Sequence, residues 1–69
     1  MSQKPRTGKV KWFDGVKKFG FITDDESGED IFLHISEIQG TDFLETEVPV
    51  EYAITETPRG KKALKVSVI

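Results

Sequence analysis

The sequence contains no cysteine and a single histidine, His34, among its 69 residues. A disulfide is therefore impossible, and a zinc site would need ligands that this chain does not have. Domains of this size often depend on such cross-links, because their cores are small. We therefore expect a fold that depends on a compact apolar interior, without a metal or any other cofactor. The lack of cysteine also fits a reducing compartment such as the cytosol.

Long apolar runs are absent as well. No stretch approaches the roughly 20 apolar residues that a membrane-spanning helix needs. The N-terminal "MSQKPRTGK" is polar and basic, unlike a signal peptide. We expect a soluble, cytoplasmic monomer with no membrane partner and no small-molecule substrate. The length predicts one domain over residues 1–69, in which residues 1–6 form a flexible N-terminal extension.

The sequence has no long amphipathic helix but five short runs rich in β-branched and aromatic residues. Turn signals such as Asp14-Gly15 and Ser27-Gly28 separate the runs. The connection over residues 36–47 is long, and the spacing of Ile35 and Ile38 predicts one helical turn at its start. The predicted strands span residues 8–13, 19–24, 30–34, 48–55 and 62–68.

Alternation within these runs predicts which side chains face inward. Five strands with one apolar face each would leave exposed edges in a flat sheet, and closure into a barrel reduces those edges. We therefore predict an all-β fold, a small five-stranded antiparallel barrel. The predicted interior consists of Val10, Ile22, Ile31, Leu33, Val48, Val50, Tyr52, Ile54, Leu64, Val66 and Val68.

The first run does not fit simple alternation. Strict alternation would place Val10 and Trp12 together inside and Phe13 outside. Adjacent large rings could instead be reoriented by a bulge or a bend. Periodicity alone leaves the direction of Trp12 open.

Charge is distributed unevenly, although the net charge is only −2. Residues 1–23 hold six basic side chains, residues 59–69 hold four, and residues 24–58 hold eleven acids with no lysine or arginine. Such asymmetry can give one basic face on a protein that is acidic overall. The alternative is that lysines at strand edges only discourage aggregation.

Aromatic side chains share one face of the second and third runs. Phe19 and Phe21 alternate together, as do Phe32 and His34, and turning them inward would expose the aliphatic residues between them. Flat rings next to cations suit single-stranded nucleic acid, since each base offers a π-face and each phosphate a negative charge. The flanking cations are Lys9, Lys11 and Lys17.

Several motifs together resemble the bacterial-type cold-shock proteins over about residues 7–68. They are "GKVKWF" at 8–13, "KKFGFI" at 17–22, "IFLHI" at 31–35, "SEIQG" at 36–40 and "TPRGKKA" at 57–63. The resemblance implies an oligonucleotide/oligosaccharide-binding barrel (OB-fold) that binds single-stranded RNA and DNA. It also implies a protein that prevents or melts RNA secondary structure, and some family members act in transcription antitermination.

The resemblance also implies roles for individual side chains, and it orients Trp12 outward. By position, the base-stacking residues are Trp12, Phe19, Phe21, Phe32, His34 and Phe43. The basic and polar contacts fall on Lys9, Lys11, Lys17, Asp30 and Arg59. No catalytic or metal-binding residue is implied.

Three positions depart from the family pattern. Lys18 stands where glycine is usual, Ile35 where phenylalanine is usual, and Asp14 where asparagine is usual. A missing ring and an added negative charge predict weaker binding or a shifted base preference.

Three other interpretations compete with that of a cold-shock protein. A nuclease would need clustered carboxylates, but the acidic residues around Ser27-Gly28 are interpreted as solvated charge at a turn. A small barrel with an aromatic face could also grip proline-rich peptides. An RNA-recognition motif would need two helices, which the sequence does not predict. We expect a protein that is not an enzyme.

Overall fold

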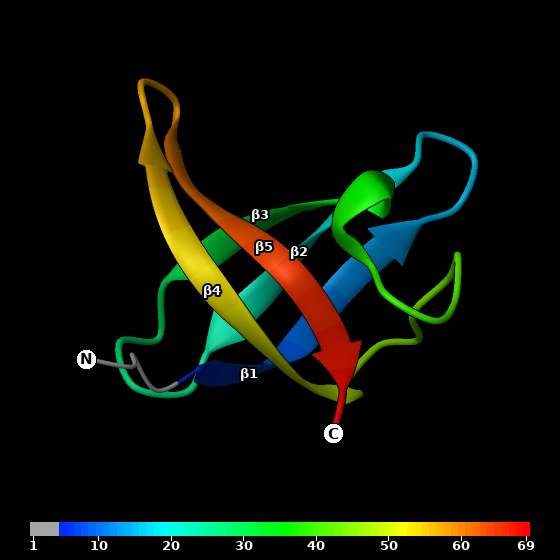
Figure 1. Cartoon of the computed structure of the whole chain (residues 1–69), viewed down its shortest axis with the longest axis horizontal. Coiled ribbons are helices and arrows are strands. Elements are labelled where there is room, and N and C mark those ends of the chain that lie inside the picture. Colours follow the sequence, from blue (N-terminus) through cyan, green and yellow to red (C-terminus); the bar gives the residue numbers. More distant parts are fainter. Residues whose placement is uncertain (1–4) are drawn as a thin grey trace.

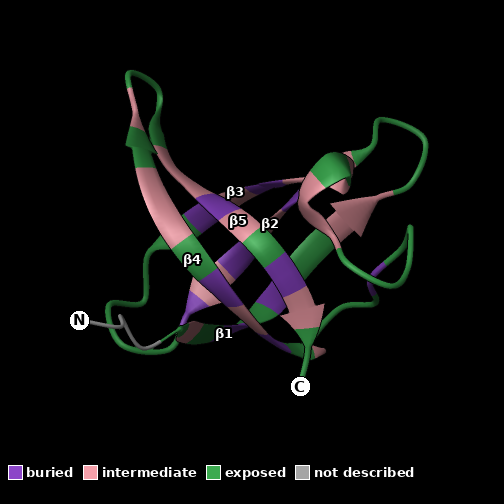
Figure 2. Ribbon diagram, in the orientation of Figure 1, coloured by how far each residue is buried: buried purple, intermediate pink, exposed green. Residues whose placement is uncertain are grey.

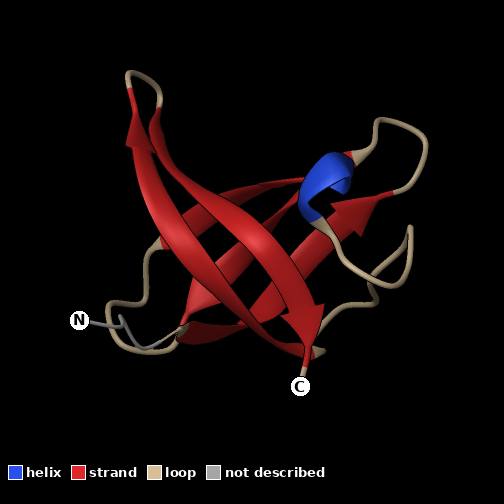
Figure 3. Ribbon diagram, in the orientation of Figure 1, coloured by secondary structure: helices blue, strands red, loops and turns tan. Residues whose placement is uncertain are grey.

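The computed structural model describes residues 5–69, which form a closed barrel with the strand order β1-β2-β3-β5-β4 (Figure 1). A single turn of 3₁₀ helix, η1 (Ile35–Glu37), follows β3 and is the blue segment in Figure 3. The predicted fold class and helical turn are confirmed. The strands are β1 (Arg6–Asp14), β2 (Phe19–Asp24), β3 (Asp30–His34), β4 (Pro49–Thr57) and β5 (Gly60–Val68).

The expected N-terminal extension over residues 1–6 falls mainly on residues 1–4, which lie outside the described residues. Arg6 already belongs to β1. Our predicted bounds agree with the structure for β2 and β3, whereas β4 and β5 continue further toward their shared turn. The β4–β5 hairpin therefore extends beyond the rest of the barrel, at the upper left of Figure 1.

All neighbouring strands pair antiparallel except β3 and β5. These two meet in parallel through Phe32 and Lys62, and a parallel bridge between Ile38 and Val66 lies further along β5. This junction closes the barrel.

The core lies inside the barrel, and buried positions alternate with exposed ones along the strands (Figure 2). Seven of the predicted interior residues are confirmed as buried: Val10, Ile22, Ile31, Leu33, Val50, Tyr52 and Val66. Val48 and Ile54 are partly buried and pack against this core. Leu44 and Ala63 also belong to it, and alternation did not predict them.

The predicted inward face of β5 is wrong at two positions. Leu64 is only partly buried, and Val68 keeps 51% of its surface exposed. Lys65 adopts a positive φ of 51°, which breaks the alternation of the strand. Ala63 and Val66, three residues apart, therefore both face the core.

An irregularity in β1 decides the direction of Trp12. Val10 lies opposite Ile22, but Trp12 lies opposite Phe21, so β1 has one residue more than β2 over this stretch. Such a bulge turns the following side chain to the other face. Trp12 is accordingly 38% exposed, as the family resemblance implied.

The acidic β2–β3 turn is not uniformly solvated, which corrects our interpretation of this segment. Asp24 is 1% exposed, and its carboxylate accepts hydrogen bonds from Arg6 Nη2 at 2.8 Å and from Tyr52 Oη at 2.6 Å. It also accepts from the backbone N–H of Ser27 at 3.0 Å. The Arg6 guanidinium, with Tyr52 and Ser27, holds the pKa of Asp24 well below its ordinary value despite burial. This network ties β1, the β2–β3 turn and β4 together.

Candidate functional site

Four aromatic side chains from β1, β2 and β3 lie in contact on the outer surface of the barrel. Ring centroids lie 5.6 Å apart for Trp12 and Phe19, and 5.4 Å apart for Trp12 and Phe21. Phe32 lies 5.8 Å from both Phe19 and Phe21. We call Trp12, Phe19, Phe21 and Phe32 the aromatic platform. The three phenylalanines are partly exposed, as alternation predicted.

Gly20 allows β1 and β2 to approach closely beneath this platform. A Cβ at Gly20 would lie 2.7 Å from the Cα of Phe13. Any side chain there would push the strands apart and disturb the rings that β1 and β2 carry.

His34 extends the platform at the end of β3, where it lies opposite Phe19. The backbone N–H of Ser36 donates to His34 Nδ1 at 3.1 Å, which fixes the ring at the start of η1. In its neutral form the ring therefore carries its hydrogen on Nε2. That N–H is the donor that His34 can offer to a ligand.

Phe43 lies apart from the platform, on the long connection between η1 and β4. Its ring packs edge-on against Phe13 with a centroid distance of 5.7 Å, and 49% of its surface is exposed. The neighbouring Leu44 is buried in the core and anchors the connection. Phe13 and Phe43 thus form a second aromatic pair near the β1–β2 turn.

The predicted cations lie on β1 and the adjacent turn. Lys9, Lys11 and Lys17 are exposed, and Lys11 Nζ lies 2.9 Å from Asp30 Oδ2. In the turn, Asp14 accepts hydrogen bonds from the backbone N–H groups of Val16 and Lys17 at 2.9 and 3.0 Å. These bonds lower the pKa of the Asp14 carboxyl, so its negative charge is held within the turn.

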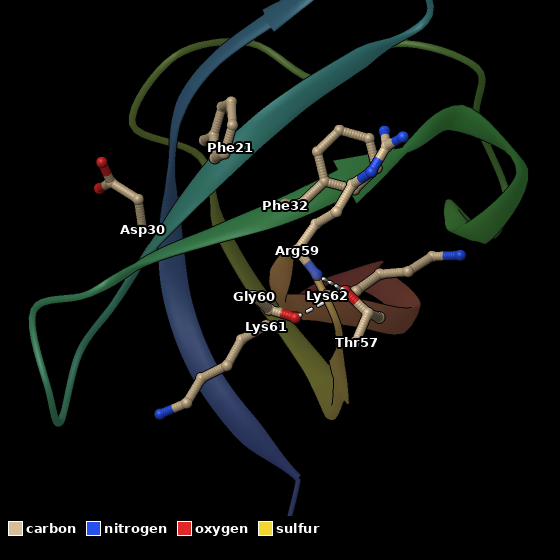
Figure 4. A pocket seen from close by; sticks show the side chains of 8 residues that line it. All are labelled: Phe21, Asp30, Phe32, Thr57, Arg59, Gly60, Lys61 and Lys62. Carbon is tan, nitrogen blue, oxygen red and sulfur yellow. Dashed lines mark hydrogen bonds between the residues drawn. The ribbon is translucent and has the colours of Figure 1, made fainter.

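A pocket of about 480 Å³ lies between the aromatic platform and the turn of the β4–β5 hairpin (Figure 4). Thr57 shapes that turn, since its Oγ1 accepts from the N–H of Arg59 at 3.2 Å and donates to the carbonyl of Gly60 at 2.8 Å. Figure 4 shows the Arg59 side chain pointing toward Phe32. The lining residues are Phe21, Asp30, Phe32, Thr57, Arg59, Gly60, Lys61 and Lys62.

The pocket brings together residues that sequence reasoning did not connect. Phe21, Phe32, Asp30 and Arg59 were predicted site residues, and they do meet here. Thr57, Lys61 and Lys62 were not predicted. Nothing in the sequence shows toward which face the β4–β5 hairpin leans.

Within residues 5–69, no group of three or more histidine, aspartate or glutamate side chains is arranged to hold a metal ion. The same part of the chain has no helix with the length and apolar character that crossing a membrane requires. The site consists of flat rings, cations and a few polar groups, which can bind a flat, anionic ligand through stacking and charge.

Comparison with known proteins gives consistent results. The family model described as "'Cold-shock' DNA-binding domain" matches residues 6–69. The "Cold shock-like protein CspD" of Bacillus cereus is 50% identical over 64 residues, which cover 90% of this chain and 96% of that protein. The "Probable cold shock protein A" of Mycobacterium tuberculosis is 46% identical over 61 residues, covering 86% of this chain and 91% of that one.

A solved structure of Drosophila Unr CSD456 shares the fold, with a TM-score of 0.81 at 19% identity. The match covers 99% of this chain and 28% of that longer chain. At this identity the likeness supports the barrel fold alone.

Proposed function

Because the chain belongs to the cold-shock DNA-binding domain family, a family of nucleic-acid-binding domains, we propose that it binds single strands of RNA and DNA across the aromatic platform. The observation that carries this proposal is the geometry of the platform, in which three strands contribute four neighbouring rings beside exposed lysines. Unpaired bases can stack on such rings, whereas paired bases keep their faces inside the duplex.

The aromatic residues and the neighbouring charged residues would make different kinds of contact with the nucleic acid. Stacking contributes about 1–3 kcal/mol per base and depends little on base identity. Phosphate contacts add affinity without sequence information and make binding salt-sensitive. In this proposal the stacking residues are Trp12, Phe19, Phe21, Phe32, His34 and Phe43. The phosphate contacts come from Lys9, Lys11, Lys17 and Arg59, with Asp30 as a polar contact at the pocket.

Binding of this kind would make the protein an RNA chaperone in the cytoplasm. A ligand that binds one state of an equilibrium shifts the equilibrium toward that state, so capture of unpaired RNA would melt weak duplexes without ATP. The same capture could relieve a terminator hairpin, which would give transcription antitermination. The protein would act as a monomer, since one barrel presents the whole platform.

A fluorescence titration tests the proposal, because Trp12 is the single tryptophan and belongs to the platform. We expect quenching by hexathymidine and hexauridine, weaker quenching by a duplex of equal length, and loss of affinity as salt is raised. A proline-rich peptide should leave the signal unchanged, and the oligonucleotides should remain intact. Unchanged fluorescence with both single strands at low salt would reject the proposal, and cleavage of them would indicate an enzyme.

A further inference from the structure

Two lysines near the pocket are already paired with carboxylates, one in the β2–β3 turn and one at the start of β3. Lys61 Nζ lies 2.6 Å from Glu29 Oε1, and Lys11 Nζ lies 2.9 Å from Asp30 Oδ2. Glu29 and Asp30 are neighbours in the sequence, whereas the two lysines come from β5 and β1. One acidic segment, residues 29–30, thus holds cations from two different strands.

The Glu29–Lys61 pair sits at the pocket and remains accessible to a ligand. Lys61 lines the pocket together with Arg59 and Lys62, and among residues 5–69 neither of those two forms a salt bridge. The side chains of Lys61 and Glu29 are 37% and 52% exposed. Figure 4 shows Lys61 and Lys62 pointing to opposite sides of their strand, so only one of the two reaches toward the acidic turn.

Charge couples the two partners closely. The hydrogen bond from Lys61 is the main cause of a lowered pKa of Glu29, and the same bond raises the pKa of Lys61. Exposed ion pairs are nevertheless weak, so another anion of suitable geometry can replace the carboxylate. The anion that the proposed function brings to this pocket is the phosphodiester.

We propose that Glu29 competes with the nucleic-acid backbone for Lys61, so that the β2–β3 turn limits both the affinity and the salt dependence of binding. This inference rests on the proposed function. Glu29 occupies the ammonium group of Lys61 in the free protein, and a phosphodiester must displace it.

The salt dependence distinguishes this competition from a simple loss of affinity. A lysine that neutralises a phosphate on a single strand releases counterions and steepens the plot of log K against log salt by about 0.7. In this protein the displaced Glu29 takes up a cation when Lys61 leaves it, which offsets that release. Removal of the carboxylate should therefore raise the affinity and steepen the salt dependence at the same time.

Glu26 provides a matched control in the same turn. Its side chain is exposed, it forms no salt bridge among residues 5–69, and its charge helps to raise the pKa of Arg6. Glu26→Gln and Glu29→Gln remove the same charge three residues apart. Only Glu29→Gln frees Lys61.

The experiment measures the dissociation constant of hexathymidine from Trp12 fluorescence at several salt concentrations. We expect Glu29→Gln to bind about two- to fivefold more tightly at low salt, the range that one exposed ion pair allows. For this variant the plot of log K against log salt should be steeper by about 0.7. Glu26→Gln should change the affinity by less than half as much as Glu29→Gln does. In a Lys61→Met background, Glu29→Gln should give no further gain.

The outcomes separate this inference from the proposed function. Failure of the unmodified protein to bind hexathymidine would reject the proposed function itself. If the unmodified protein binds and the two glutamine variants have equal effects, the inference is overturned. Such a result would indicate that the negative charge of this segment acts on the oligonucleotide at long range. A gain from Glu29→Gln that persists with Lys61→Met would overturn it as well, because the affected cation would not be Lys61.

Discussion

Replacement of Phe21 by alanine is the most direct test of the aromatic platform. Phe21 contacts Trp12 and Phe32, with centroid distances of 5.4 and 5.8 Å, and it also lines the pocket. Its removal would take away the stacking surface for one base, which contributes about 1–3 kcal/mol. The dissociation constant for hexathymidine should therefore rise by about 5- to 150-fold.

The same replacement should cost less stability than a core truncation. Phe21 is partly exposed and sits in two ring pairs, and each pair contributes about 0.5–1.5 kcal/mol. We expect the free energy of unfolding to fall by about 1–3 kcal/mol. Leu33 is fully buried, so Leu33→Ala should lower the free energy of unfolding by about 2–5 kcal/mol. The fraction of this variant that stays folded should keep its affinity for hexathymidine.

Two measurements on each variant check this reasoning. Fluorescence titration gives the affinity, and thermal unfolding followed by circular dichroism gives the stability. Phe21→Leu is the matched control, because it keeps apolar bulk but offers no flat π-face, so its affinity should fall nearly as far as that of Phe21→Ala. Full affinity of Phe21→Ala, or full recovery in Phe21→Leu, would refute stacking on this ring.

Three further predictions concern other parts of the chain. Asp24→Asn should lower the free energy of unfolding by about 2–3 kcal/mol, because it removes the charge from a buried hydrogen-bond network; equal stability in denaturant titrations would contradict this. Since folding lowers the pKa of Asp24, its contribution is complete above the ordinary value of 3.8 and is lost as the pH falls below it, so the variant and the unmodified protein should converge in acid. Lys18→Gly should raise the free energy of unfolding by up to about 1 kcal/mol, and with it the melting temperature, because Lys18 holds a positive φ of 66°. A lower melting temperature would argue against strain there. Ile35→Phe should tighten hexathymidine binding by up to about tenfold by adding a ring beside His34, and unchanged affinity in the fluorescence titration would show that position 35 does not meet a base.

Local sequence patterns predicted the central strands of the barrel well. β2 and β3 have the predicted bounds because each is short, alternates without interruption and ends at a clear turn. The outward direction of Phe19, Phe21 and Phe32 followed from the same alternation, since the aliphatic residues between them fill the core. That these rings bind bases stays a prediction.

Alternation failed where the backbone departs from regular strand geometry. The bulge in β1 and the positive φ of Lys65 in β5 each shift the side chains that follow by one face. Neither site carries a glycine or another local signal of the irregularity. Trp12, Leu64 and Val68 therefore could not be placed by periodicity.

Contacts between segments that are distant in the sequence could not be predicted either. Asp24 is buried because Arg6, 18 residues away, and Tyr52, 28 residues away, meet its carboxylate. The two residues that follow it, Asp25 and Glu26, are acidic and exposed, so the segment resembles an ordinary solvated turn. The pocket was missed for a similar reason, since one wall comes from residues 21–32 and the other from residues 57–62.

The parallel junction between β3 and β5 has a consequence for how the barrel opens. Phe32 on one side and Lys62 on the other are joined by the one pair that the two strands share, and both line the pocket. Local opening is easiest where the fewest backbone hydrogen bonds must break. An oligonucleotide lying over this junction would hold its two sides together, and the backbone amides there would then exchange with deuterium more slowly in the complex than in the free barrel.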